Sequence, residues 1–370
     1  MGMCKVAGAF IKASLLLALA VTAMAGCTTN YGARAVAPSG YQYNYAIAQS
    51  QDEQLLLNIV RLRYRDTIVF MDIGSVTTQR QYVAGVSAEN MLPFKGLKEG
   101  STLLIPGATY SETPTVSYAP LKGSEFARNL LSPISAETIV LLANSGWSIE
   151  RLLACCVQRL GGLANGPRAS GPTPSELPDN SDFREAASIL RKIQREERVY
   201  VEYHVIDGEK GAETYLVIDA QEGAECSRLE TLLSATDCLM QFRLVERKDE
   251  FGARELLAKT RTVLGALYTL SHAVAVPPEH TSAGLVTISE MQSARTANWD
   301  EFLAHQFSVK SGRENPDGAF VKVQYRDHWF WIDDADLESK TTFSLVSFLL
   351  SLQSAESDGA SPLLTLSAGR

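Results

Sequence analysis

The sequence predicts an α+β fold in which helices and mainly antiparallel strands are organised as two candidate subdomains. Apolar residues make up 45% of the chain and charged residues 21%, proportions that are ordinary for a globular protein. Segments of helical periodicity and segments of strand character follow one another irregularly, unlike the regular alternation of a doubly wound parallel sheet. A stretch rich in proline and glycine divides this pattern into two parts.

The first part, residues 45–163, contains predicted helices and strands. Ser50 and Glu53 form a capping box ahead of an apolar face, which predicts a helix over about 51–64. β-Branched and aromatic residues broken by glycine and proline predict strands over 67–75, 80–87 and 101–118. Helical patterns follow over 121–133, 136–144 and 149–160, and the last two form a predicted helical hairpin.

Residues 164–180 contain four prolines and two glycines, and this composition predicts an exposed loop or linker. Residues 181–370 form the second candidate subdomain. Its predicted helices cover 182–197, 226–237, 255–276 and 340–354. Its predicted strands cover 199–206, 215–219 and 239–246, with a β-hairpin over 320–325 and 328–332.

The charge of the chain narrows the classes of partner. Acidic residues number 42 against 34 lysines and arginines, a formal net charge of −8. Nonspecific binding to nucleic acid depends on a basic surface that neutralises phosphates. We therefore expect no nucleic-acid partner.

The N-terminus has the features of an export signal over residues 1–26. Lys5 and Lys12 supply positive charge, and residues 13–23 form a short apolar run. The run is too short to cross a bilayer as a stable helix. Small residues then lead to Cys27.

The run Met24-Ala25-Gly26-Cys27 resembles the lipobox of bacterial lipoproteins, although methionine replaces the commoner leucine at its first position. The resemblance implies cleavage between Gly26 and Cys27, a diacylglycerol on the Cys27 sulfur, and an acyl chain such as palmitate on the new amine. Several acyl chains anchor a protein far more firmly than one. We expect no other cofactor.

The residue after the cysteine bears on the destination of the protein. Inner-membrane retention in that family commonly uses an aspartate at this position, where this chain has Thr28. The resemblance therefore implies the outer membrane of a Gram-negative cell, with the body of the protein facing the periplasm. Residues 27–44 are polar and without periodicity, which predicts a flexible tether between anchor and body.

Four further cysteines, Cys155, Cys156, Cys226 and Cys238, follow Cys27. An oxidising compartment permits disulfides among them, and four cysteines allow three pairings. Cys155 and Cys156 lie in an apolar helical pattern, where we expect free buried thiols. No cysteine or histidine spacing is typical of zinc, so we predict no metal site.

Two groups of residues are candidate contacts for a partner or ligand. Trp329 and Trp331 share one face of a predicted strand, where they can bind a sugar or a protein, or pack under the following helix. Arg61, Arg63 and Arg65 form either a basic patch or the favourable cationic end of a helix.

The chain contains no GxSxG, HExxH, Walker or GxGxxG motif. We therefore expect a noncatalytic assembly, scaffold or accessory component of an envelope complex, with other envelope proteins as partners. Two alternatives stay open. One is an anchored hydrolase of peptidoglycan, glycan or lipid, and the other is a lipoprotein that binds a ligand between its two halves. The sequence leaves self-association undecided.

Overall fold

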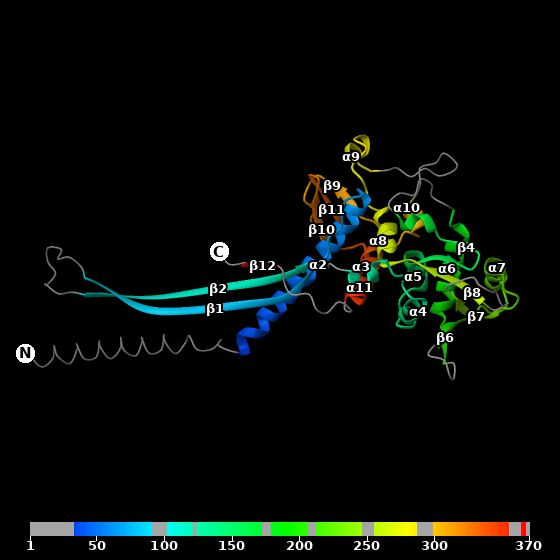
Figure 1. Cartoon of the computed structure of the whole chain (residues 1–370), viewed down its shortest axis with the longest axis horizontal. Coiled ribbons are helices and arrows are strands. Elements are labelled where there is room, and N and C mark those ends of the chain that lie inside the picture. Colours follow the sequence, from blue (N-terminus) through cyan, green and yellow to red (C-terminus); the bar gives the residue numbers. More distant parts are fainter. Residues whose placement is uncertain are drawn as a thin grey trace, which may run out of the picture. The chain divides into compact units, whose positions relative to one another are not determined.

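The computed structural model describes residues 33–90, 102–120, 124–171, 179–205, 212–245, 255–286, 299–354 and 364–367. The predicted signal and Cys27 lie outside these ranges. The chain divides into two compact units, residues 1–51 and 52–370. Helices and mostly antiparallel strands together confirm the α+β class (Figure 1).

The described helices belong to both predicted halves of the chain. They are α2 (Ala33–Arg63), α3 (Ser124–Leu131), α4 (Ala136–Asn144), α5 (Ile149–Cys156), the 3-10 helix η1 (Pro167–Ser170), α6 (Ser181–Arg195), α7 (Ala224–Leu233), α8 (Val263–Ser271), α9 (Pro278–Ser282), α10 (Trp299–Phe302) and α11 (Leu337–Ser354).

The described strands form three sheets. The first has the order β1 (Met71–Asn90), β2 (Thr102–Pro120) and β12 (Leu364–Ser367). The second has the order β4 (Leu163–Ala164), β3 (Val157–Leu160), β8 (Glu255–Thr260), β7 (Leu239–Val245), β6 (Ala212–Asp219) and β5 (Val199–Val205). The third has the order β10 (Ala319–Tyr325), β11 (His328–Asp333) and β9 (Lys310–Gly312).

Helix α2 corrects the predicted tether. The helix begins at Ala33, so the tether prediction is wrong for residues 33–44, and the expected capping box lies inside the helix. Helix propagation adds one hydrogen bond per residue once a turn exists, and alanine is the best helix former. The helix nevertheless runs through Pro38 and Gly40, which disfavour a helix interior, so local propensity alone does not explain its start at Ala33. The predicted apolar face is confirmed, because Leu56, Ile59 and Val60 are fully buried.

The chain segment after α2 is held by a side chain rather than by a strand partner. Asn58 is buried; its Nδ2 donates to the Val69 carbonyl at 2.7 Å, and its Oδ1 accepts from the Val69 amide at 3.1 Å. Both backbone groups of Val69 are thereby satisfied without a sheet. The predicted strand over 67–75 consequently starts only at Met71.

Strands β1 and β2 form a long antiparallel hairpin, drawn in blue and cyan in Figure 1. Pairing runs from Met71 opposite Pro120 to Asn90 opposite Thr102, with one irregularity between Ile73 and Ser75. The two strands predicted over 67–75 and 80–87 are thus one strand of 20 residues. At about 3.3 Å per residue it is roughly 65 Å long.

The six-stranded sheet joins strands from both sides of the predicted linker over 164–180. Strands β3 and β4 precede or enter this segment, and β3 pairs with β8 of the second half. A single cluster of buried apolar residues also includes members of both halves. Residues 164–180 therefore do not separate two independent cores. All neighbouring pairs in this sheet are antiparallel except β7 and β8, which are parallel.

The predicted long helix over 255–276 is wrong in its first part, where β8 lies. The segment Glu-Leu-Leu-Ala-Lys has high helical propensity, but it pairs with β7 on one side and β3 on the other. Pairing with existing strands outweighs this weak local preference. Helix α8 starts only at Val263, where the Thr262 hydroxyl caps it by accepting from the Gly265 amide at 2.9 Å.

A buried arginine lies where β8 ends. Arg261 is fully buried and donates to the carbonyl oxygens of Ala154, Cys155 and Val157 at 2.9–3.0 Å. It also donates to the Asn165 carbonyl at 2.5 Å and to Ser170 Oγ at 3.0 Å. The first two carbonyls belong to the end of α5, where helical carbonyls lack partners within their own helix. Arg261, just after β8, therefore caps the end of α5, which leads directly into the neighbouring strand β3.

We predict that Arg261→Met lowers the free energy of unfolding by about 3 kcal/mol or more. The variant removes the side-chain donor to the Cys155 and Asn165 carbonyls and one of the two side-chain donors to the Ala154 and Val157 carbonyls. Urea denaturation measures the effect. Lys259→Met is the matched control, since Lys259 is exposed two residues earlier on the same strand; its expected change is within about 0.5 kcal/mol. Equal stability of the two variants would contradict the capping role of Arg261.

Candidate functional site

A cavity of about 460 Å³ lies between the six-stranded sheet and three helices. Helices α4, α5 and α6 contribute one wall, and strands β3, β8, β7, β6 and β5 contribute the other. The lining residues come from both sides of the predicted linker over 164–180. The volume falls within the range that small-molecule sites occupy, roughly 300–1,000 Å³.

The walls of the cavity are mainly apolar. The side chains that close it from both sides include Val140, Leu153, Val157, Leu190, Leu216 and Leu244. Most of its polar lining comes from one region, where the ends of α4 and α6 approach the start of β5. These residues are Asn144, Arg191, Gln194, Glu197 and Tyr200. The cavity therefore has an apolar body and a polar end.

Gln194 fixes the geometry of the polar end. Its Oε1 accepts from the Ile149 amide at 3.0 Å and from Arg191 Nη1 at 2.8 Å. Its Nε2 donates to the carbonyls of Ala143 at 3.3 Å and Trp147 at 3.0 Å. The side-chain amide thus ties α6 to the connection between α4 and α5. This brace holds Arg191 at the cavity.

The charge environment of Arg191 is positive on one side. Burial lowers its pKa first, and the nearby cations Arg195 and Arg151 lower it further. Glu150 acts in the opposite direction, and burial raises the pKa of Glu150 itself. Arg151 is buried and paired with Glu338 of α11. Arg191 is therefore a partly buried cation beside other cations.

A second polar group, the histidine–tyrosine cluster, consists of Tyr64, His280, His328 and Glu279. The Tyr64 hydroxyl and His280 Nδ1 share a hydrogen bond of 2.7 Å, and the rings of His280 and His328 lie 4.7 Å apart. His328 Nε2 donates to Glu279 Oε1 at 3.0 Å. Arg313 also binds Glu279 and is the main cause that lowers the pKa of this carboxyl to about 2. Burial raises the pKa of Tyr64 to about 12.

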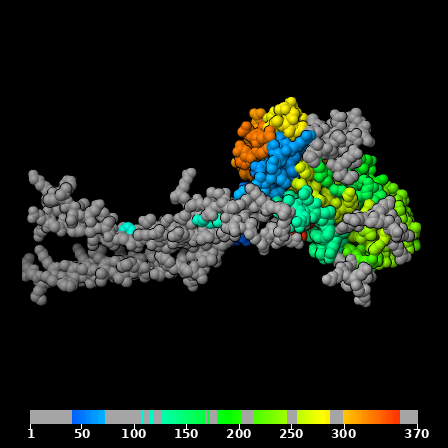
Figure 2. All heavy atoms as spheres, in the orientation of Figure 1, coloured from blue at the N-terminus to red at the C-terminus, as the bar shows by residue number. Residues whose placement is uncertain are grey.

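The cluster joins elements that are distant in sequence. Tyr64 follows α2, His280 lies on α9 and His328 begins β11. Figure 2 shows α9 in yellow beside the sheet β9–β11 in orange. The cluster shares no residue with the lining of the cavity. The arrangement expected of the alternative hydrolase, a pocket holding mutually oriented titratable groups, is thus not formed by these two sites.

The predicted contact residues Trp329 and Trp331 lie on the less buried face of β11. Burial alternates along this strand, with His328, Phe330 and Ile332 buried and the tryptophans half-buried. Trp331 Nε1 donates to Asp333 at 2.7 Å, and Lys322 Nζ lies 5.7 Å from the Trp329 ring centre. The shared face of the tryptophans is as predicted, while their role as a binding surface stays a prediction.

The three predicted arginines occupy different environments. Arg61 and Arg63 are half-buried in the last turn of α2, and burial lowers the pKa of Arg63. Arg65 is exposed just beyond the helix, at a φ of 61°. Arg61 and Arg63 fit the helix-dipole interpretation. The structure does not bring the three together as one exposed patch.

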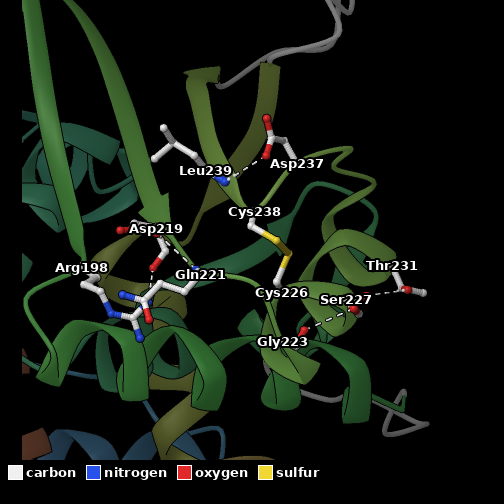
Figure 3. Close-up of a disulfide and its surroundings, with 10 residues drawn as sticks. All are labelled: Arg198, Asp219, Gln221, Gly223, Cys226, Ser227, Thr231, Asp237, Cys238 and Leu239. Carbon is white, nitrogen blue, oxygen red and sulfur yellow. Dashed lines mark hydrogen bonds between the residues drawn. A yellow bond between two sulfur atoms is a disulfide. The ribbon is translucent and has the colours of Figure 1, made fainter.

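The structure shows which of the disulfide pairings left open by the sequence is formed. Cys226 of α7 and Cys238, just before β7, form a disulfide across 12 residues (Figure 3). Cys155 and Cys156 are free and buried, as expected. Among the described residues, only Cys226, Glu230 and Cys238 place three donor atoms close enough to hold a metal ion. Their two sulfurs are bonded to each other, so this group does not fit a metal site.

Sequence reasoning missed Arg191, Gln194 and the histidine–tyrosine cluster. Gln194 has no motif, and Tyr64 and His280 are separated by 216 residues. The sequence feature that could have indicated the cluster is His328, which shares a face of the predicted strand with Phe330 and Ile332. A buried histidine needs a hydrogen-bond partner.

No helix in the part of the chain that the structure describes combines the length and hydropathy that a membrane crossing requires. Comparison with protein-family models, curated proteins and solved structures finds no match for this chain.

We predict that His272 makes folding sensitive to mild acid. Burial, then Arg63, lowers its pKa to about 3, and its ring stacks on Trp299 at 4.1 Å. Because the unfolded state takes up a proton near pH 6.5 and the folded state does not, the stabilisation is full above that pH and is lost as the pH falls toward 3. Between pH 7.5 and 5.5 the loss is about 1.4 kcal/mol.

Urea titrations at several pH values check this dependence. His272→Phe keeps an aromatic ring against Trp299 and is expected to reduce the pH dependence; His280, whose pKa burial also lowers, still contributes. His305→Gln replaces an exposed histidine that contacts Asp300 and is the comparison variant, which is expected to retain the dependence caused by His272. A wild-type slope that persists in His272→Phe would contradict the assignment.

Proposed function

We propose that this protein is a noncatalytic lipoprotein of the Gram-negative outer membrane that faces the periplasm and assembles with further copies of itself through the β1–β2 hairpin. The observation that carries the proposal is the hairpin, whose long strands have outer edges that no described strand of this chain covers over most of their length. The lipobox-like run that ends at Cys27 supports the anchor. The Cys226–Cys238 disulfide supports an oxidising compartment.

The edges of the hairpin support self-assembly. In the described sheet β1 pairs with β2 alone, and β12 covers β2 only over Thr115–Tyr118. One edge of β1 and residues 102–114 of β2 therefore lack a partner strand within the described chain. Two-stranded ribbons are marginally stable alone, and exposed edges invite pairing with another chain.

A second copy is the occupant that fits these edges best. The two free edges lie on opposite sides of the same ribbon, because β1 and β2 are neighbours and each is open on its outer side. The β1 edge of one copy can therefore pair with the β2 edge of the next. Such head-to-tail contacts repeat from copy to copy and form a ring when the rotation closes.

The polar groups of the body support a noncatalytic role. In the histidine–tyrosine cluster, the Tyr64, His280, His328 and Glu279 side chains bond to one another or to Arg313. These bonds join α2, α9 and β11, which is a structural task.

The anchor is tested by replacing Cys27 and Thr28 in turn. We predict that Cys27→Ala abolishes palmitate incorporation and releases the protein from outer-membrane fractions. Thr28→Asp, which introduces the family's retention residue, is expected to keep the acyl label but move the protein to the inner membrane. Palmitate labelling of Cys27→Ala at the wild-type level would contradict the anchor.

The assembly is tested by photo-crosslinking of the full chain in cells. A photoreactive residue replaces Gln79 in β1 or, as the control, Gln241 in β7, a strand that has partners on both sides, β6 and β8. We predict dimers and larger species from position 79 alone, with β2 peptides of another copy as the crosslinked product. Monomers only, or adducts with other proteins only, would contradict self-assembly.

A further inference from the structure

We infer that the cavity between the six-stranded sheet and helices α4, α5 and α6 binds a single acyl chain, with an anionic head group at Arg191. The inference rests on the shape of the cavity, its lining and the unused donors of Arg191. It is independent of the proposed assembly, because none of the hairpin residues lines the cavity.

The cavity is elongated across the sheet. Its lining includes residues of five successive strands, from Val157 on β3 through β8, β7 and β6 to Val201 on β5. Strands in a sheet are about 4.8 Å apart, so four spacings give roughly 19 Å. A C–C bond of about 1.5 Å advances an extended chain by roughly 1.3 Å, so this length suits an acyl chain of about 15 carbons.

The lining selects an apolar occupant. Leu153, Leu190, Leu216 and Leu244 face the cavity from four different elements. A sugar or nucleotide requires hydrogen-bond partners along its length, and these walls do not supply them. Sites for apolar small molecules typically have mainly apolar walls with a few polar groups, as this cavity has.

The polar end selects the head group. Arg191 Nη1 donates to Gln194 Oε1. This is the only hydrogen bond that the Arg191 side chain makes among the described residues. A guanidinium has five N–H donors arranged to bind carboxylate or phosphate in pairs. Arg195 and Arg151 add positive charge near Arg191, while Glu150 and Glu338 oppose it, and Glu338 is already paired with Arg151. Glu197 at the rim is exposed to solvent, which screens its charge. A carboxylate or phosphate is thus the head group that fits.

The head group can come from a free fatty acid or from a phospholipid, and the test separates these sources. The full chain carries Cys27→Ser, so that no attached acyl chain competes for the cavity. Cis-parinaric acid reports occupancy by fluorescence, and palmitic acid or vesicles of dipalmitoyl phosphatidylglycerol compete with it. Displacement by palmitic acid at one equivalent assigns a fatty acid, and displacement by vesicles alone assigns a phospholipid. Failure of parinaric acid to bind, or of both competitors to displace it, overturns the inference.

Two matched pairs of variants locate the binding. Val140→Phe fills the cavity, while Leu141→Phe adds a ring to the next, exposed residue of α4. Arg191→Gln removes the head-group donor, while Lys192→Gln removes an exposed cation beside it. We expect at least a tenfold loss of parinaric acid affinity in the first member of each pair and less than a twofold change in the second.

Circular dichroism checks the fold of each variant. If Val140→Phe fails to fold, the pair at residues 191 and 192 decides, since Arg191 is only half-buried. Equal affinities of Arg191→Gln and Lys192→Gln overturn the assignment of the head group. Equal affinities of folded Val140→Phe and Leu141→Phe would show that the acyl chain binds outside the cavity, and they overturn the assignment of the site.

Discussion

The buried guanidinium of Arg261 is the interaction on which the organisation of the body depends. Placing a cation in a core is costly unless hydrogen bonds replace its hydration. Here backbone carbonyls from α5, β3 and Asn165 do so, together with Ser170. Burial lowers the pKa of Arg261 only to about 10, so it stays charged at neutral pH. The negative end of the α5 dipole lies beside this charge, which makes the helix end and the cation mutually stabilising.

The same site defines one end of the cavity. Asn165 donates from Nδ2 to the carbonyls of Leu153, Ala154 and Val157 and accepts at Oδ1 from Asn180. The carbonyls of Ala154 and Val157 thus receive donors from both Arg261 and Asn165. This shared set fixes the transition from α5 to β3, where Leu153 and Val157 line the cavity. Gln194 performs the corresponding task at the polar end, so two polar braces hold an apolar space open between them.

The sequence is informative where local pattern and tertiary structure agree. The apolar face of α2 and the β10–β11 hairpin were predictable, since the hairpin needs only strand character on both sides of Arg326-Asp327, which adopt positive φ values of 49° and 61°. Strand β8 was not predictable, because its partners β3 and β7 decide its conformation against helical propensity. Arg261 was equally hidden. Its partners are 91 to 107 residues away in sequence and are mostly backbone carbonyls, which every residue type has. The cavity depends on the same long-range packing.

The hairpin is fixed to the body at its base, and this bears on how copies can pair. Gln54 Oε1 accepts from the Met71 amide at 3.0 Å, immediately after the Asn58 contacts to Val69. Phe70 packs edge-on against Phe126 of α3, which follows β2, at 5.9 Å. β1 therefore begins, and β2 ends, next to packed residues of the body. A strand register between two free ribbons is poorly defined when nothing else positions them. Because the base of each ribbon is held, the packing of neighbouring bodies would set the register of the ribbons. The conformational entropy lost on aligning two ribbons would then be lost once per copy rather than once per residue.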